Sequence, residues 1–293
     1  MAEVAYAEPR HGDRVKRTLL RSPRVLFGGA VLTALLLCAI GASWLAPRNP
    51  LEQDLLYYFL PPFWNAEADP LYMLGTDSLG RDILSRLIHG ARVAAVVALV
   101  AASLACLLGT TLGLIAGFYG GRVDMAISRL VDVWMAFPPV LLSVVLVAVI
   151  GAGLPAVVIA IVIVDWTRFC RVVRAEVMVQ RAQDYVTAAR IIGLARWRIM
   201  AGEVLPNVVP LLIVLLTLEM GIAVVVEAIL SFVGLSVSTD APTWGGMIAE
   251  GRANVHQAWW LMALPIGCIV VTVIALNMLG DGLRSALDPV LRR

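Results

Sequence analysis

Long stretches without a single charged residue constrain this chain more than any other feature. Val25–Leu45 contains none, and neither do the segments between Arg92 and Arg122 or between Asp132 and Asp165. A helix needs about 20 predominantly apolar residues to cross the hydrocarbon core of a bilayer. Charged residues make up only 15% of the chain and hydrophobic ones 60%. Because too little polar surface remains to coat a water-soluble globule, soluble, disordered and nucleic-acid-binding proteins are excluded.

The apolar runs predict six membrane spans. The 32 residues between Asp132 and Asp165 would overshoot the bilayer as one helix, at 1.5 Å per residue. The sequence Gly151-Ala-Gly-Leu-Pro155 inside this run supplies a turn, which indicates two spans joined by a tight hairpin. Further spans are expected at about Val208–Phe232 and about Trp259–Leu279. We therefore expect an all-α integral membrane protein with six transmembrane helices.

The first span has an alternative interpretation as a cleavable signal peptide, because arginines precede it. Val25–Leu45 is longer than the apolar region of a typical signal peptide, and a long polar leader comes before it. Retention is therefore favoured, with residues 1–24 as an N-terminal tail and residues 25–293 as one six-span domain.

The distribution of basic residues predicts the orientation. With the N-terminus in the cytoplasm, 18 of the 23 basic residues face inward and five face outward. Short loops rich in arginine stay on the cytoplasmic side. Both termini are therefore expected in the cytoplasm.

The residue types exclude several chemistries. Lys16 is the only lysine, and no lysine follows a glycine, so the chain lacks the phosphate loop of ATPases. If ATP drives this protein, another chain binds it. The four cysteines lie in or at the ends of apolar runs, and the three histidines have no metal-ligand spacing. We expect no catalytic residue, metal site or cofactor on this chain.

Two connections are too long to be simple links. The outer one spans about residues 46–92. Its last part has apolar residues at helical spacing, from Leu79 to Ile88, with Arg81, Asp82 and Arg86 between them. This pattern predicts an amphipathic helix on the outer membrane surface; a simple extension of the second span is the alternative.

The inner connection spans about residues 171–205 and has seven arginines in or beside it. Its pattern predicts a helix over Tyr185–Ile192, an interruption at Gly193, and a second helix over Leu194–Val204 that Pro206 ends. Two short helices around a glycine would form a knob that docks into a groove of a partner protein. A solvated charged loop is the alternative.

The inner connection resembles a loop of known transport proteins. Asp184-Tyr-Val-Thr-Ala-Ala-Arg-Ile-Ile-Gly193, followed after nine residues by Glu203-Val-Leu-Pro-Asn207, is similar to the E-A-A-x3-G-x9-I-x-L-P loop. That loop marks the permease subunits of bacterial ATP-binding-cassette importers. Thr187 stands at the motif's Glu position and Glu203 at its Ile position.

Four other parts of the chain resemble the C-type subunit of the dipeptide and oligopeptide permeases of the bacterial inner membrane. They are Leu74–Arg92, Leu230–Leu235, Thr243–Met247 and the ending Asn277–Pro289. The resemblance implies a heterodimer with a B-type permease, two cytoplasmic ATPase subunits that bind ATP and Mg, and an extracytoplasmic substrate-binding protein. It also implies a loop that couples the permease to the ATPases. The matching positions are Thr187, Ala188, Ala189, Arg190, Gly193, Leu205 and Pro206, and Ala188 and Ala189 would permit close approach to the partner.

Two features within the spans could serve transport. Gly109, Gly113 and Gly117 form a stripe of small residues, which lets another helix approach closely and predicts packing within the permease. Charge inside a membrane is costly, so Glu219 and Glu227 are candidates for the translocation path or the permease interface. Hydrogen bonding within a packed helix interface is the alternative for both. Asp165 and Arg168 are interpreted as boundary residues at the inner end of a span.

The leading hypothesis is half of an ATP-driven importer for di- or oligopeptides. The alternatives are import of nickel or another small solute within the same family, and a self-sufficient secondary transporter. The two halves of the chain share no motif, which weakens the secondary transporter because many of these are built from inverted repeats.

Overall fold

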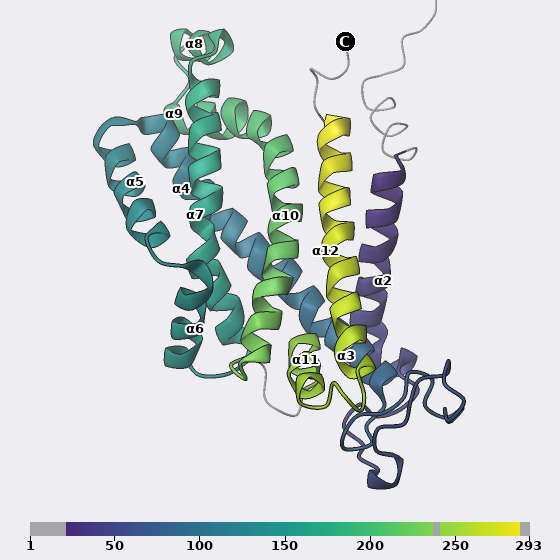
Figure 1. Ribbon diagram of the computed structural model, residues 1–293. Coiled ribbons are helices and arrows are strands. Elements are labelled where there is room, and N and C mark those ends of the chain that lie inside the picture. The colour runs from purple at the N-terminus through teal and green to yellow at the C-terminus, as the bar shows by residue number, and fades with distance from the viewer. Residues whose placement is uncertain (1–21, 237–240, 288–293) are drawn as a thin grey trace, which may run out of the picture.

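The computed structural model describes residues 22–236 and 241–287, and the structure of this part of the chain is helical (Figure 1). The connection after the first helix contains a short 3₁₀ turn, Leu55–Tyr57. The helices are α2 (Pro23–Leu45), α3 (Ile83–Val96), α4 (Ala102–Tyr119), α5 (Gly121–Met135), α6 (Pro139–Ile150), α7 (Leu154–Arg181), α8 (Asp184–Ile191), α9 (Arg196–Ile199), α10 (Leu205–Phe232), α11 (Trp244–Ala253) and α12 (Trp260–Leu287).

Within the described residues, four continuous helices are long and apolar enough to cross a membrane: α2, Ile83–Tyr119, Arg196–Phe232 and residues 260–286 of α12. The helices α5 and α6 make a fifth if they count as one span bent by 87°. The helix α7 begins with eleven uncharged residues, and Asp165, Arg168 and Arg171 then interrupt its apolar surface. The all-helical membrane fold is confirmed, whereas the count of six spans stays a prediction.

The hairpin between α6 and α7 lies where the sequence predicted it. The helix α6 ends at Ile150, Gly151 and Gly153 have φ angles of 106° and 149°, and α7 begins at Leu154. The segment before this hairpin is less regular than expected, because Pro138 and Pro139 separate α5 from α6. Proline lacks the backbone N–H that would continue the hydrogen-bond ladder. The chain before the hairpin therefore has a break between α5 and α6.

The expected surface helix before the second span is also wrong. The helix that begins at Ile83 continues through a π-helical turn, Val97–Ala101, into α4. The alternative, an extension of the second span, is correct. Arg81 and Arg86 do not need the aqueous surface, because both form buried ion pairs with Asp77.

Pro206 does not end a helix as the sequence suggested. The chain stays helical from Arg196 to Phe232, with a π-helical turn over Met200–Val204 directly before the proline. The π-helical turn changes the hydrogen-bond pattern where Pro206 could not donate, so the proline is accommodated near the start of α10.

The glycine stripe of α4 packs against α7 of the same chain. A Cβ atom on Gly113 would lie 2.7 Å from the carbonyl oxygen of Cys170, and one on Gly117 would lie 2.8 Å from that of Arg174. A Cβ on Gly109 would likewise collide with the carbonyl oxygen of Trp166. The two backbones therefore touch along three helical turns.

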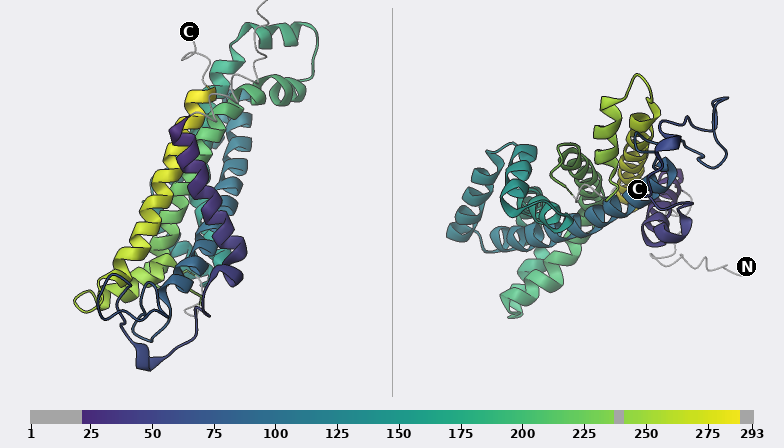
Figure 2. Two further views of the ribbon diagram at one scale, coloured as in Figure 1. Left: turned by 90° about the vertical axis from the view of Figure 1, so that its right-hand side faces the viewer. Right: turned by 90° about the horizontal axis from the view of Figure 1, so that it is seen from below.

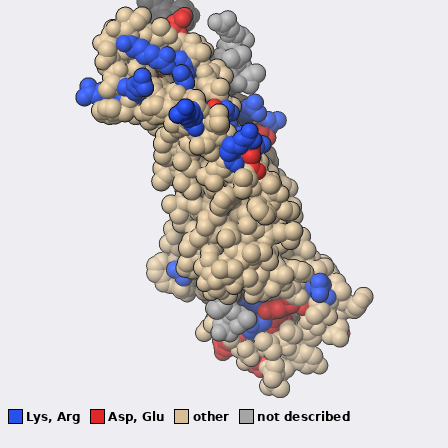
Figure 3. All heavy atoms as spheres, turned by 90° about the vertical axis from the view of Figure 1, so that its left-hand side faces the viewer, with Lys and Arg blue, Asp and Glu red and all other residues tan. Residues whose placement is uncertain are grey.

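The molecule has an uncharged middle and charged ends. The first described helix begins, and the last one ends, at the same end of the molecule as α8 and α9 (Figure 1). Most arginines visible on one face gather at this end, and a broad band without charge lies below them (Figure 3). The band is the surface expected against lipid, and the side of the membrane on which each end lies stays a prediction.

Candidate functional site

The helices α8 and α9 form a knob (residues 184–199, hereafter the α8–α9 knob) that projects beyond the ends of the long helices and to one side of them (Figures 1 and 2). Ile191 and Ile192 are 81% and 74% exposed, and Trp197 is also exposed. An exposed apolar cluster on a charged surface marks a protein-interaction site. The helix–glycine–helix pattern is present as predicted.

The sequence-predicted residues of this loop divide between its surface and its interior. Thr187, Ala188, Arg190 and Pro206 are exposed, and Leu205 is partly buried. Ala189 is only 6% exposed and packs in a cluster with Val186 and Ile199. Ala188 is therefore the alanine available to a partner, and the expectation that both face one is corrected, because one face of α8 must cover the loop's own core.

Gly193 turns the chain between α8 and α9. Its φ angle is 82°, in the left-handed region that side chains other than glycine adopt at a cost. The backbone N–H of Gly193 donates to the carbonyl of Arg190, and that of Leu194 donates to the carbonyl of Ala189. This pair of bonds is a Schellman motif, which caps α8.

The α8–α9 knob is fastened to the long helices by polar and apolar contacts. The hydroxyl of Tyr185 donates to the side-chain oxygen of Gln180 at 2.7 Å and accepts from Asn207 at 3.3 Å. Burial raises the pKa of the Tyr185 hydroxyl, which keeps it protonated as a donor at neutral pH. Val186 and Ile199 pack against Val177 of α7 and Val208 of α10. The knob is therefore attached to both α7 and α10.

A second site lies on the long helices, where α7 and α10 bring three charged groups together. Glu219 is 1% exposed, and its Oε2 lies 3.6 Å from Nη1 of Arg168. Asp165 is 3% exposed and interacts with the same two side chains. Asp165 is therefore buried within the protein, and its position at the end of a membrane span stays a prediction. Asp165 lies near Glu219 because α7 and α10, which are far apart in the sequence, pack together. The sequence alone does not predict this packing.

A cavity of about 620 Å³ adjoins this charged group. Ser143, Asp165, Arg168 and Asn277 supply its polar lining, and apolar residues of α6, α7, α10 and α12 supply the rest. Glu219 lies behind this lining. Charged residues within membrane proteins face such a cavity or one another, and the structure shows both arrangements here.

Glu227 does not line this cavity. Its Oε1 accepts hydrogen bonds from the hydroxyls of Ser231 at 2.6 Å and Ser236 at 3.0 Å. The carboxyl group thus joins α10 to the segment that follows it. The hydrogen-bonded alternative is the one that the structure shows for Glu227.

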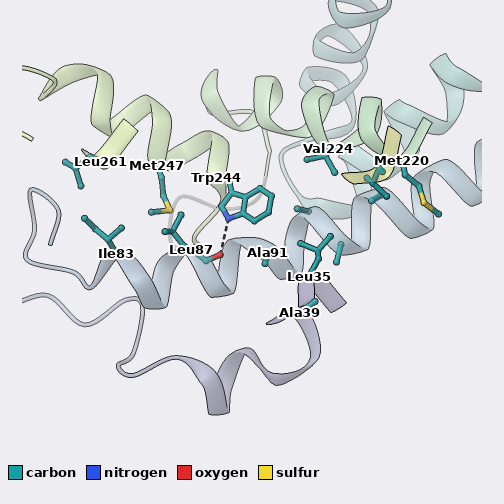
Figure 4. Packing of buried hydrophobic residues seen from close by; sticks show 14 of the residues in the cluster. Leu35, Ala39, Ile83, Leu87, Ala91, Met220, Val224, Trp244, Met247 and Leu261 are labelled. Atoms are coloured by element: carbon teal, nitrogen blue, oxygen red, sulfur yellow. Dashed lines mark hydrogen bonds between the residues drawn. The ribbon is translucent and has the colours of Figure 1, made fainter. Parts of the chain in front are cut away.

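The end of the molecule opposite the α8–α9 knob contains an ion-pair cluster that the sequence did not predict. Glu250 of α11 accepts from Arg81 at 3.0 Å and from both terminal nitrogens of Arg86 at 2.7 and 3.0 Å, and both arginines also contact Asp77. Trp244 of α11 donates to the carbonyl of Leu87 at 3.0 Å (Figure 4). These contacts hold the long connection, α3 and α11 together.

Comparison with known proteins agrees with this architecture. A family described as "Binding-protein-dependent transport system inner membrane component" matches residues 109–293. A second, described as "N-terminal TM domain of oligopeptide transport permease C", matches residues 12–62.

Among curated proteins, the chain is 44% identical over 266 residues to the "Di/tripeptide transport system permease protein DppC" of Pseudomonas aeruginosa (strain UCBPP-PA14), covering 90% of this chain and 88% of that protein. It is 39% identical over 273 residues to the "Dipeptide transport system permease protein DppC" of Escherichia coli (strain K12), covering 93% and 91%. Among solved structures, an inward-facing conformation of the MetNI methionine ABC transporter matches with a TM-score of 0.58 and 18% identity, covering 69% of this chain and 97% of that chain. This last likeness shows the fold alone.

Proposed function

Because the chain belongs to the family of binding-protein-dependent transport system inner membrane components, we propose that it forms half of the translocation path of an ATP-driven importer for di- and oligopeptides. It is a multi-pass permease subunit of the bacterial inner membrane. The names of its relatives support a peptide as the transported solute.

The α8–α9 knob is the coupling element in this proposal. Its exposed Ile191 and Ile192 are the observation on which the proposal mainly rests, because they are apolar side chains with no partner among the described residues. They would dock into a groove of an ATPase subunit that binds ATP and Mg. The chain itself performs no bond chemistry and holds no cofactor.

The helix that continues from the knob would transmit the movement. Arg196–Phe232 is one helix of 37 residues, which is about 55 Å long at 1.5 Å per residue. It begins in α9, passes Glu219 beside the cavity, and ends near α11. Nucleotide binding in the ATPases would tilt this helix and move the wall of the cavity.

Three other partners complete the assembly. A B-type permease subunit would close the path on the side of the cavity, a second ATPase subunit would dock on that permease, and an extracytoplasmic binding protein would deliver the solute. The ion-pair cluster around Glu250 would support the surface that receives this protein.

The test is a charge placed on the knob. Ile191→Glu should detach the ATPases during purification in mild detergent, because a carboxylate would have to be buried in an apolar groove. Leu56→Glu, on an 88% exposed leucine at the opposite end, is the matched control and should leave the complex intact. Retention of ATPases by Ile191→Glu would contradict the coupling role of this surface.

A further inference from the structure

A hollow of about 470 Å³ lies beneath the α8–α9 knob, between the knob and the ends of the long helices. Three arginines line it, one from each of three elements: Arg181 at the end of α7, Arg190 in α8 and Arg196 in α9. Phe118, Tyr119, Leu194 and Ile199 supply the rest of the lining. Ligand pockets in proteins are commonly about 300–1,000 Å³ in volume.

The three arginines lack a counter-charge among the described residues. Their neighbours on α7 each have one, since Arg168 pairs with Glu219, Arg171 with Asp132 and Arg174 with Asp124. No such ion pair forms for Arg181, Arg190 or Arg196 in the described part of the chain. Three cations that share one hollow repel each other, so the hollow favours an anion.

The level of the hollow indicates where the anion comes from. Phe118 and Tyr119 are the last two residues of the membrane-crossing helix Ile83–Tyr119, so the hollow lies at the membrane surface on the side of the knob. Aromatic side chains favour this level of a bilayer, and basic pockets between helices there bind lipid headgroups. The uncharged band begins directly below the arginine-rich end (Figure 3).

We propose that this hollow binds the phosphate-containing headgroup of an anionic phospholipid in the leaflet on the side of the knob. Arginine suits this ligand, because its guanidinium group can donate two parallel hydrogen bonds to phosphate oxygens. The headgroup bridges α7 to the knob and neutralises the three arginines. The acyl chains extend along the apolar surface below Tyr119.

The test uses the whole transporter complex in a neutral detergent, titrated with phosphatidylglycerol and followed by native mass spectrometry. The wild type should retain one tightly bound lipid. Arg181→Gln/Arg196→Gln should bind it about 30-fold more weakly, at about one factor of five per arginine near a membrane surface. Arg122→Gln/Arg129→Gln removes two exposed arginines of α5 outside the hollow and should bind like the wild type.

Two further arms separate the sources of an anion. Phosphatidylcholine and inorganic phosphate should each fail to displace the bound lipid; displacement by inorganic phosphate alone would overturn the lipid assignment. Lipid bound only after the ATPases are removed would also overturn it, because an acidic surface of the partner would then be the natural occupant. Equal binding by the Arg181/Arg196 variant and the wild type would overturn the site itself, provided that both unfold at the same temperature.

Discussion

The carboxyl groups of Asp165 and Glu219 are buried between α7 and α10, whereas the Arg168 side chain beside them is partly exposed. Arg168 is the cation beside the two buried carboxyl groups of Asp165 and Glu219. Removing the cation leaves buried negative charge without compensation, which is far more costly than removing both partners.

A double-mutant cycle measures this interaction. Arg168→Gln should lower the unfolding temperature of the permease in detergent, and adding Glu219→Gln should restore part of the loss, because Asp165 remains buried without its cation. The single change should cost about 1–3 kcal/mol, less than a fully buried pair because Arg168 is partly exposed. If the loss in the double variant equals the sum of the losses in the two single variants, the two side chains do not interact.

Glu227 has a different role, and its prediction concerns transport. Glu227→Leu leaves the hydroxyls of Ser231 and Ser236 without their acceptor, at a cost of about 1–3 kcal/mol for unpaired buried groups. Peptide uptake in vesicles should fall while the complex still assembles, because the segment between α10 and α11 loses its attachment. Glu227→Gln keeps an acceptor and should retain most uptake; wild-type uptake by Glu227→Leu would reduce the residue to a tolerated buried carboxyl.

At the residue scale, the sequence was enough to select candidate residues but did not show what surrounds each of them. Charge within an apolar run was enough to select Glu219 and Glu227, because such residues are rare in membranes. It could not distinguish a carboxyl beside a cavity from one bonded to two serines. Nor could the sequence show that Ala188 is exposed and Ala189 buried. That distinction depends on which face of α8 packs against Ile199.

At the scale of elements, the glycine stripe predicted a close helix contact, and the structure shows it between the backbones of α4 and α7. Gly113→Ala would place a methyl group 2.7 Å from a backbone oxygen of α7, which the rigid backbone cannot avoid. We expect a loss of about 1–3 kcal/mol, typical of overpacking, seen as a lower unfolding temperature in detergent.

Gly29→Ala is the control for this change. Gly29 is also within a helix, and a Cβ there would meet no atom within 4 Å. It should be neutral or stabilising by up to about 1 kcal/mol, because alanine favours helix. If Gly113→Ala is as neutral or stabilising as Gly29→Ala, the α4–α7 contact is not tight enough to exclude a methyl group.

The elements that the sequence predicted well are those with strong local signals. The turn at residues 151–155 and the helix–glycine–helix pattern around Gly193 follow from backbone preferences of glycine and proline. The continuation of α3 into α4, and of α9 through Pro206, depend on ion pairs and π-helical turns formed in the folded state. The helix α11 was missed because its ten residues include three glycines and lack a helical apolar period.

At the scale of the whole molecule, the orientation rests on the 18 to 5 distribution of basic residues. Reporter fusions after Arg181 should therefore read cytoplasmic, and fusions near Asn65 should read external. Alkaline phosphatase and green fluorescent protein fusions give opposite signals on the two sides. An external signal after Arg181 would reverse the orientation and remove the α8–α9 knob from the reach of cytoplasmic ATPases.

The overall architecture of a permease with a projecting knob makes coupling to ATPases the central claim. The most direct measurement is ATP hydrolysis by the complete complex in proteoliposomes, with and without the peptide-loaded binding protein. The account predicts that loaded binding protein stimulates hydrolysis in the wild type, and that Ile191→Glu reduces it to the unstimulated level with loss of uptake. Peptide transport by this chain in proteoliposomes without any ATPase subunit would contradict the account.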